Sequence, residues 1–196
     1  MIKSACDTDI QKLCPPTVID QGGVLECLRQ KVNQLTSQCH KRLFKVEQLQ
    51  AVDEYADYTL VQACRRVIEK KCRDVDGDQL LPCLIEAQKN GEVDPKCGKV
   101  IATRQLEESK DVRLNPALYK SCNQDMEKHC KKELKTLLDQ DNEAKSDVED
   151  DLISCLKKHK KSLSAECGTQ VREMTRESAQ NYKLVNKFRT LIITYS

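Results

Sequence analysis

The twelve cysteines of this chain fall into three sets of four with a recurring spacing. The first cysteine of each set follows that of the previous set by 58 residues, and the first two cysteines within a set are always 8 apart. A recurrence of this kind marks tandem copies of one structural unit. The three sets are Cys6, Cys14, Cys27 and Cys39; Cys64, Cys72, Cys83 and Cys97; and Cys122, Cys130, Cys155 and Cys167.

The cysteine spacing favours disulfides over metal or redox chemistry. Zinc sites use short C-x2-4-C pairs, which are missing here, and the C-x-x-C redox motif is missing too. An even number of cysteines in every unit indicates disulfides and an oxidising compartment. The alternative is a reduced intracellular helical scaffold, in which the cysteines are small core residues.

Apolar periodicity predicts three helices in each unit and gives no strand pattern. The first two cysteines enclose an apolar residue midway, as in Cys6, Ile10 and Cys14, so that all three lie on one helical face. A second helix begins close to the third cysteine, which is followed by leucine in every unit. The third helix begins close to the fourth cysteine, three residues after a residue that can cap it; these are Thr36, Asp94 and Ser164.

Four cysteines allow three pairings, and the helix order favours the nested one. The second cysteine ends the first helix and the third lies early in the second helix, and these positions meet in an antiparallel hairpin. The first cysteine then lies level with the fourth, since eight helical residues span about 12 Å. The predicted bridges are Cys6–Cys39 around Cys14–Cys27, Cys64–Cys97 around Cys72–Cys83, and Cys122–Cys167 around Cys130–Cys155.

We expect repeats at 1–54, 55–112 and 113–184, followed by a divergent tail at 185–196 in which no helix is expected. The third repeat carries extra residues between its first two helices. Seven acids and one lysine occupy 139–151, which predicts a solvated, mobile loop.

Composition argues against nucleic-acid and membrane-spanning classes. The formal net charge is only +2, whereas nucleic-acid-binding domains are strongly basic. No apolar run approaches the roughly 18 residues that a membrane helix needs. We expect no nucleic-acid partner and no membrane span within this chain.

Catalytic and metal motifs find little support. The chain lacks G-x-S-x-G, H-E-x-x-H and a glycine-rich phosphate loop. The acids Asp74, Asp76 and Asp78 resemble part of a calcium loop, but no glutamate closes it at the required position, and Asp7 with Asp9 is no better. We expect no enzymatic activity, no cofactor and no metal.

The densest basic run is Lys157, Lys158, His159, Lys160 and Lys161. Clustered positive charge raises the local potential, so these lysines are a candidate patch for an anionic glycan or an acidic partner. The alternative is an ordinary solvated helix face, screened by the neighbouring acidic loop.

The units resemble the Golgi family of cysteine-rich repeat proteins that includes a cysteine-rich fibroblast growth factor receptor. The similarity runs from about residue 3 to residue 185. The residues that carry it include Ala5-Cys6 with Asp9, Glu26-Cys27-Leu28, Leu35-Thr36-Ser37-Gln38-Cys39, Asp94-Pro95-Lys96-Cys97, Arg113-Leu114-Asn115-Pro116 and Ser154-Cys155-Leu156.

The resemblance implies a Golgi membrane glycoprotein with a large lumenal array of repeats, whose membrane anchor lies elsewhere in the full protein. It implies binding of fibroblast growth factors, and of selectin-type or glycan partners. One departure is that the cysteine due near Ile192 is missing.

The sequence therefore predicts an all-α tandem array of three disulfide-stapled three-helix repeats that acts as a non-enzymatic lumenal binding module. The alternative is a structural or cargo-retention scaffold of the Golgi lumen without a specific ligand site.

Overall fold

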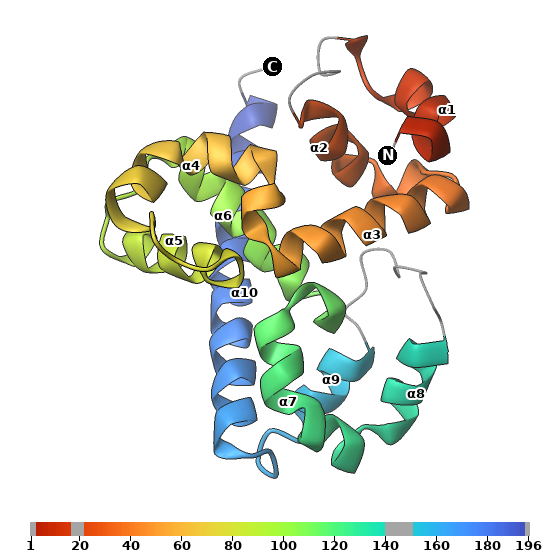
Figure 1. Cartoon of the computed structure of the whole chain (residues 1–196), viewed down its shortest axis with the longest axis vertical. Helices are drawn as coiled ribbons and strands as arrows, with labels where there is room; N and C mark the ends of the chain where they lie inside the picture. The colour runs from red at the N-terminus through yellow and green to blue at the C-terminus, as the bar shows by residue number, and fades with distance from the viewer. Residues whose placement is uncertain (1–2, 17–21, 140–150, 195–196) are drawn as a thin grey trace. The chain divides into compact units, whose positions relative to one another are not determined.

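Helices make up all the regular structure that is described for this chain (Figure 1). The computed structural model describes residues 3–16, 22–139 and 151–194. Within these ranges no strand forms, so the predicted all-α class is confirmed. The chain divides into two compact units, one running up to Cys97 and the other beginning at Gly98.

The first unit holds two successive helical groups that follow the cysteine sets. The first group is α1 (Lys3–Leu13), α2 (Gly23–Gln30), the short 3-10 helix η2 (Val32–Gln34) and α3 (Ser37–Val52). The next elements are η3 (Glu54–Ala56), α4 (Tyr58–Lys71), η4 (Gly77–Gln79) and α5 (Leu80–Lys89).

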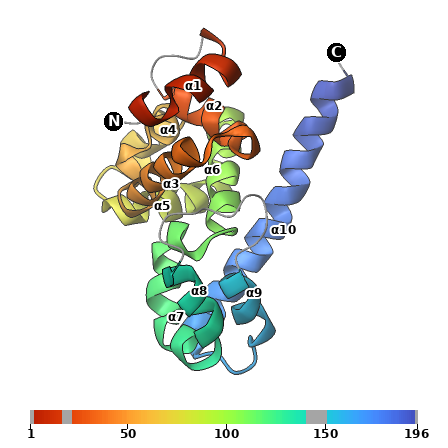
Figure 2. The same cartoon turned by 90° about the vertical axis from the view of Figure 1, so that its right-hand side faces the viewer.

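The second unit begins inside the third helix of the second repeat. That helix is α6 (Pro95–Glu108), followed by η5 (Val112–Leu114), α7 (Pro116–His129), α8 (Lys131–Asp139), α9 (Asp151–Lys158) and α10 (Ala165–Thr194). Helices α7, α8 and α9 pack against one another, and α10 packs along α7 (Figure 2).

Each third helix begins at the predicted cap. The hydroxyls of Thr36 and Ser164 accept hydrogen bonds from the backbone amides of Cys39 and Cys167. The carboxylate of Asp94 accepts from the amides of Lys96 and Cys97. These side chains satisfy first-turn amides that have no partner within the helix, which explains why the helices begin there.

The connections between repeats are built twice in the same way. Asp53 and Asp111 each accept from the amide two residues later, which closes the short helices η3 and η5. Four residues further on, Asp57 caps α4 and Asn115 caps α7. The predicted repeat boundaries, after residues 54 and 112, fall within η3 and η5 and stay a prediction.

Aliphatic side chains and cysteines fill the core, as the low aromatic content requires. Leu28 and Leu43 are fully buried in the first repeat, and Leu60 and Leu84 in the second. In the third repeat Leu118 and other buried side chains surround the disulfides. They include Met126, Leu152, Ile153, Leu156 and Val171.

Two parts of the chain differ from the expectation. The tail predicted to lack a helix is helical, because α10 runs without a break from Ala165 to Thr194. In the third repeat a separate helix, α8, occupies residues 131–139 of the connection between the first two predicted helices, and only its last residue belongs to the predicted acidic loop. Of that loop, residues 140–150 lie outside the described part of the chain.

Candidate functional site

Six disulfides join the cysteines in nested pairs. The outer bridges, Cys6–Cys39, Cys64–Cys97 and Cys122–Cys167, join the first helix of each repeat to the third, with Cα–Cα distances of 4.6–4.8 Å. The inner bridges, Cys14–Cys27, Cys72–Cys83 and Cys130–Cys155, have Cα–Cα distances of 5.9–6.0 Å. Each repeat is thus cross-linked by one outer and one inner disulfide. Each bridge stabilises the folded state by about 2–4 kcal/mol because it lowers the conformational entropy of the unfolded chain.

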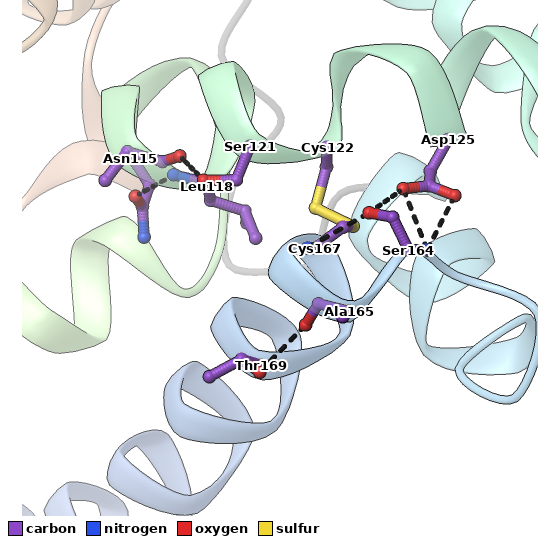
Figure 3. Close-up of a disulfide and its surroundings, with 10 residues drawn as sticks. Asn115, Leu118, Ser121, Cys122, Asp125, Ser164, Ala165, Cys167 and Thr169 are labelled. Carbon is purple, nitrogen blue, oxygen red and sulfur yellow. Dashed lines mark hydrogen bonds between the residues drawn. A yellow bond between two sulfur atoms is a disulfide. The ribbon is translucent and has the colours of Figure 1, made fainter.

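A buried carboxylate reinforces the outer bridge in the first and third repeats. Asp125 on α7 accepts from both the amide and the hydroxyl of Ser164, the latter at 2.7 Å, one helical turn from the Cys122–Cys167 bridge (Figure 3). Asp9 makes the same two contacts with Thr36. Both carboxylates are buried. Each of these aspartates therefore fixes the residue that caps the third helix.

The second repeat lacks this contact and has different residues at both positions. Val67 occupies the place of Asp9 and Asp125, three residues after the first cysteine of the set, and it is buried. The cap itself is a carboxylate, Asp94. A second carboxylate beside Asp94 would add like-charge repulsion in a buried place, so an apolar residue fits there.

A buried arginine ties the first repeat together. Arg29 on α2 donates to Glu47 on α3 at 3.2 Å, pairs with Glu26, and also donates to Gln50. Gln50 in turn donates to the backbone carbonyl of Ala56 in η3. No sequence motif marks this network, because it joins residues from three separate elements.

Glu54 is the most perturbed acid among the described residues. Its side chain is buried in η3 and accepts from the backbone amide of Leu81 at the start of α5. Burial raises the pKa of Glu54 to about 7. The charges of Asp78 and Asp57 push it in the same direction, while the backbone hydrogen bonds oppose it. Glu54 therefore fixes η3 to α5 and titrates near neutral pH.

The predicted basic run lies at the end of α9 and in the turn that follows. Lys158, Lys160 and Lys161 are exposed, whereas Lys157 is half-buried and has an interaction partner. The ring of His159 stacks on that of His129, at the end of α7, with centroids 5.3 Å apart and planes 21° apart. The sequence analysis did not foresee this pairing, which joins residues 30 positions apart.

Two of the acids considered for calcium lie close to other polar groups of the chain. Asp9 is held by Thr36, and Asp78 lies near Glu54 in η4. In the described ranges no three His, Cys, Asp or Glu side chains come together in a way that holds a metal ion. The same ranges contain no helix long and apolar enough to cross a membrane.

These features define a class of protein: an all-α tandem repeat protein whose units are braced by nested disulfides. The chain belongs to the cysteine rich repeat family, which it matches over residues 1–36, 37–92 and 95–164. With these bounds, the Cys6–Cys39 bridge joins the first matched segment to the second, and Cys64–Cys97 joins the second to the third. The Cys122–Cys167 bridge joins the third segment to a residue just after its end.

The relatives are proteins of one name. The chain is 36% identical over 182 residues to Golgi apparatus protein 1 of Rattus norvegicus, 37% over 185 residues to that of Gallus gallus, and 35% over 182 residues to that of Homo sapiens. Each alignment covers 92% of this chain but only 15–16% of the relative. Their name agrees with the predicted Golgi location. No solved structure matches the chain.

Proposed function

We propose that this chain is a non-enzymatic binding module of the Golgi that engages secreted or cell-surface proteins, with fibroblast growth factors as the partner class to test first. The observation that carries the proposal is identity of 35–37% to Golgi apparatus protein 1 across 92% of the chain. The alignments extend over most of the chain in which the three cysteine sets lie.

The structure supports a binding role through its construction. The polar side chains that are most deeply buried serve folding: Asp9 and Asp125 fix helix caps, and Arg29 and Glu54 join elements. The disulfides hold the exposed helix faces in a fixed arrangement within each repeat. Preorganised surfaces lose less entropy on binding than flexible ones.

Direct binding tests the proposal. The full chain, immobilised with its disulfides intact, should retain fibroblast growth factors from solution, and the same chain after reduction and alkylation should not. A basic protein of unrelated fold, such as lysozyme, controls for charge alone. Failure of every growth factor to bind above the lysozyme control would overturn the partner class and favour the scaffold role.

A further inference from the structure

The stacked pair His129 and His159 lies at the centre of a surface rich in lysine. Six exposed lysines lie within three residues in sequence of one of the two rings. We call these six, together with the two histidines, the α7–α9 basic surface; its lysines are Lys128, Lys131, Lys132, Lys158, Lys160 and Lys161.

The fold assembles this surface from segments that are separate in the sequence. Helices α7, α8 and α9 pack against one another (Figures 1 and 2). The Cys130–Cys155 bridge fixes the end of α7 to α9 with a Cα–Cα distance of 6.0 Å. Because His129 precedes Cys130 directly, the bridge also fixes the place of the histidine pair.

Helix electrostatics do not account for the whole cluster. Lys157 and Lys158 lie in the last turn of α9, where a cation is stabilised by the helix dipole. Lys131 and Lys132 begin α8, where a cation is disfavoured by the dipole. Among the described residues, no carboxylate pairs with these two lysines or with Lys158. A bound anion would offset both the unfavourable interaction of Lys131 and Lys132 with the helix dipole and the repulsion among the lysines.

His129 supplies an independent sign of an incomplete site. Its Nε2 atom is buried without a hydrogen-bond partner in the described structure, whereas buried polar atoms usually have one. His159 stacks over the ring and is itself exposed.

We propose that the α7–α9 basic surface binds a sulfated polysaccharide. The partner is a polyanion because the lysines come from three segments, and one chain of sulfates can follow all three.

Other charged groups near the rings also bear on how this surface attracts an anion. The ion pair of Arg113 with Asp111 lies in and beside η5, before the opposite end of α7, and is too distant to compete. The charged side chains closest to the rings in sequence, on the helices packed together with α7, are mostly cationic. They are Glu127 and Lys128 on α7, Lys131, Lys132 and Glu133 on α8, Lys157 and Lys158 on α9, and Glu166 on α10.

The repeat supplies a matched control. Lys70 and Arg73 in the second repeat stand 58 residues before Lys128 and Lys131, are exposed, and lie at the equivalent helix end. Their neighbour at the place of His129 is Lys71, which pairs with Glu92 at 2.8 Å. Replacing Lys70 and Arg73 with alanine removes two positive charges, as replacing Lys158 and Lys160 does, and leaves the histidine pair unchanged.

The experiment measures heparin affinity of the full chain at pH 7.4. We expect Lys158→Ala with Lys160→Ala to lower affinity roughly tenfold. Lys70→Ala with Arg73→Ala should change it much less, and fully desulfated heparin should not bind.

Each result decides one part of the proposal. Equal loss from the two double-lysine variants would overturn the surface, because net charge alone would then explain binding. Intact disulfides and an unchanged far-UV circular dichroism spectrum identify variants that fold. The measurement contains no growth factor, so its outcome is independent of the proposed function.

Discussion

The second and third repeats bury their carboxylates in opposite places. Glu54 lies at the junction before the second repeat, and Val112 lies 58 residues later, at the junction before the third. Within the first helix the second repeat has Val67, and the third has Asp125. The same scaffold therefore tolerates either an apolar or a charged residue at both positions, provided that the partner groups change as well.

The difference teaches that the disulfide framework is shared while the polar contacts around it vary. In the third repeat Asp125 holds the cap of α10, and the junction is apolar. In the second repeat Glu54 holds the start of α5, and the cap Asp94 is supported without a carboxylate on the first helix. Each buried acid has a backbone donor, which is the condition for burying a polar group at tolerable cost.

The largest effect should come from removing an outer bridge. The Cys6–Cys39 and Cys64–Cys97 bridges each close 33 residues, so Cys→Ala at both ends should lower the free energy of unfolding by about 4 kcal/mol in either repeat. Local opening of the third helix should differ between the two repeats. In the first repeat Asp9 still accepts hydrogen bonds from the capping residue Thr36, whereas Val67 at the same place in the second repeat cannot. Hydrogen exchange should therefore accelerate more at the start of α6 than at the start of α3. Equal acceleration would contradict the comparison.

The next effect is the pH dependence that Glu54 gives to the first unit. Its pKa is raised from 4.5 to about 7 in the folded state, so its ionisation disfavours folding. Stability from this group is fully present below about pH 4.5 and is lost as the pH rises through about 7, by about 3 kcal/mol in all. Urea unfolding at pH 5 and pH 8 measures the loss.

Glu54→Gln is the matched variant for this measurement. The amide keeps an acceptor for Leu81 but cannot ionise, so most of the difference between pH 5 and pH 8 should disappear. A pH dependence that persists unchanged would assign the titration to another group.

A smaller effect is expected where Asp125 fixes Ser164. Asp125→Ala leaves the Ser164 amide and hydroxyl without their buried acceptor, which should cost about 2 kcal/mol. Glu127→Ala, at an exposed position two residues later on α7, serves as the control and should change stability little. Thermal unfolding of both variants makes the comparison.

The smallest effect should be the coupling between the two exchangeable positions of the second repeat. Val67→Asp alone sets a carboxylate beside Asp94 and should destabilise the chain. Val67→Asp with Asp94→Thr recreates the arrangement of Asp9 and Thr36 and should recover part of the loss. We expect a coupling free energy of about 1 kcal/mol in a double-mutant cycle. Strict additivity would show that the two positions do not compensate each other.

The sequence predicts the helices and their caps because both depend on local patterns. Cysteines at a spacing of eight define the face of each first helix, and Thr36, Asp94 and Ser164 mark where the third helices begin. The contacts between an aspartate and a capping hydroxyl leave a less direct signal in the sequence. Aspartate stands three residues after Cys6 and Cys122, and these two cysteines belong to the sets whose capping residue carries a hydroxyl.

Other features depend on tertiary packing and leave weaker signals. Leu134, Leu137 and Leu138 have helical spacing that could have indicated α8. Divergence of residues 185–194 from the repeat pattern does not remove their helix, because these residues contain no proline or glycine. The contacts of Arg29 and the stacking of His129 on His159 join residues that only the folded chain brings together.

The nested bridges also determine how such an array would respond to tension. A pull on the chain ends passes through each outer bridge and cannot lengthen the segment that the bridge encloses. The stretches left to extend are Cys39 to Cys64 and Cys97 to Cys122, each 25 residues long. Each can reach about 85 Å when drawn straight. Tandem repeats of this kind would therefore lengthen in equal steps, with the helical hairpins of every repeat kept closed.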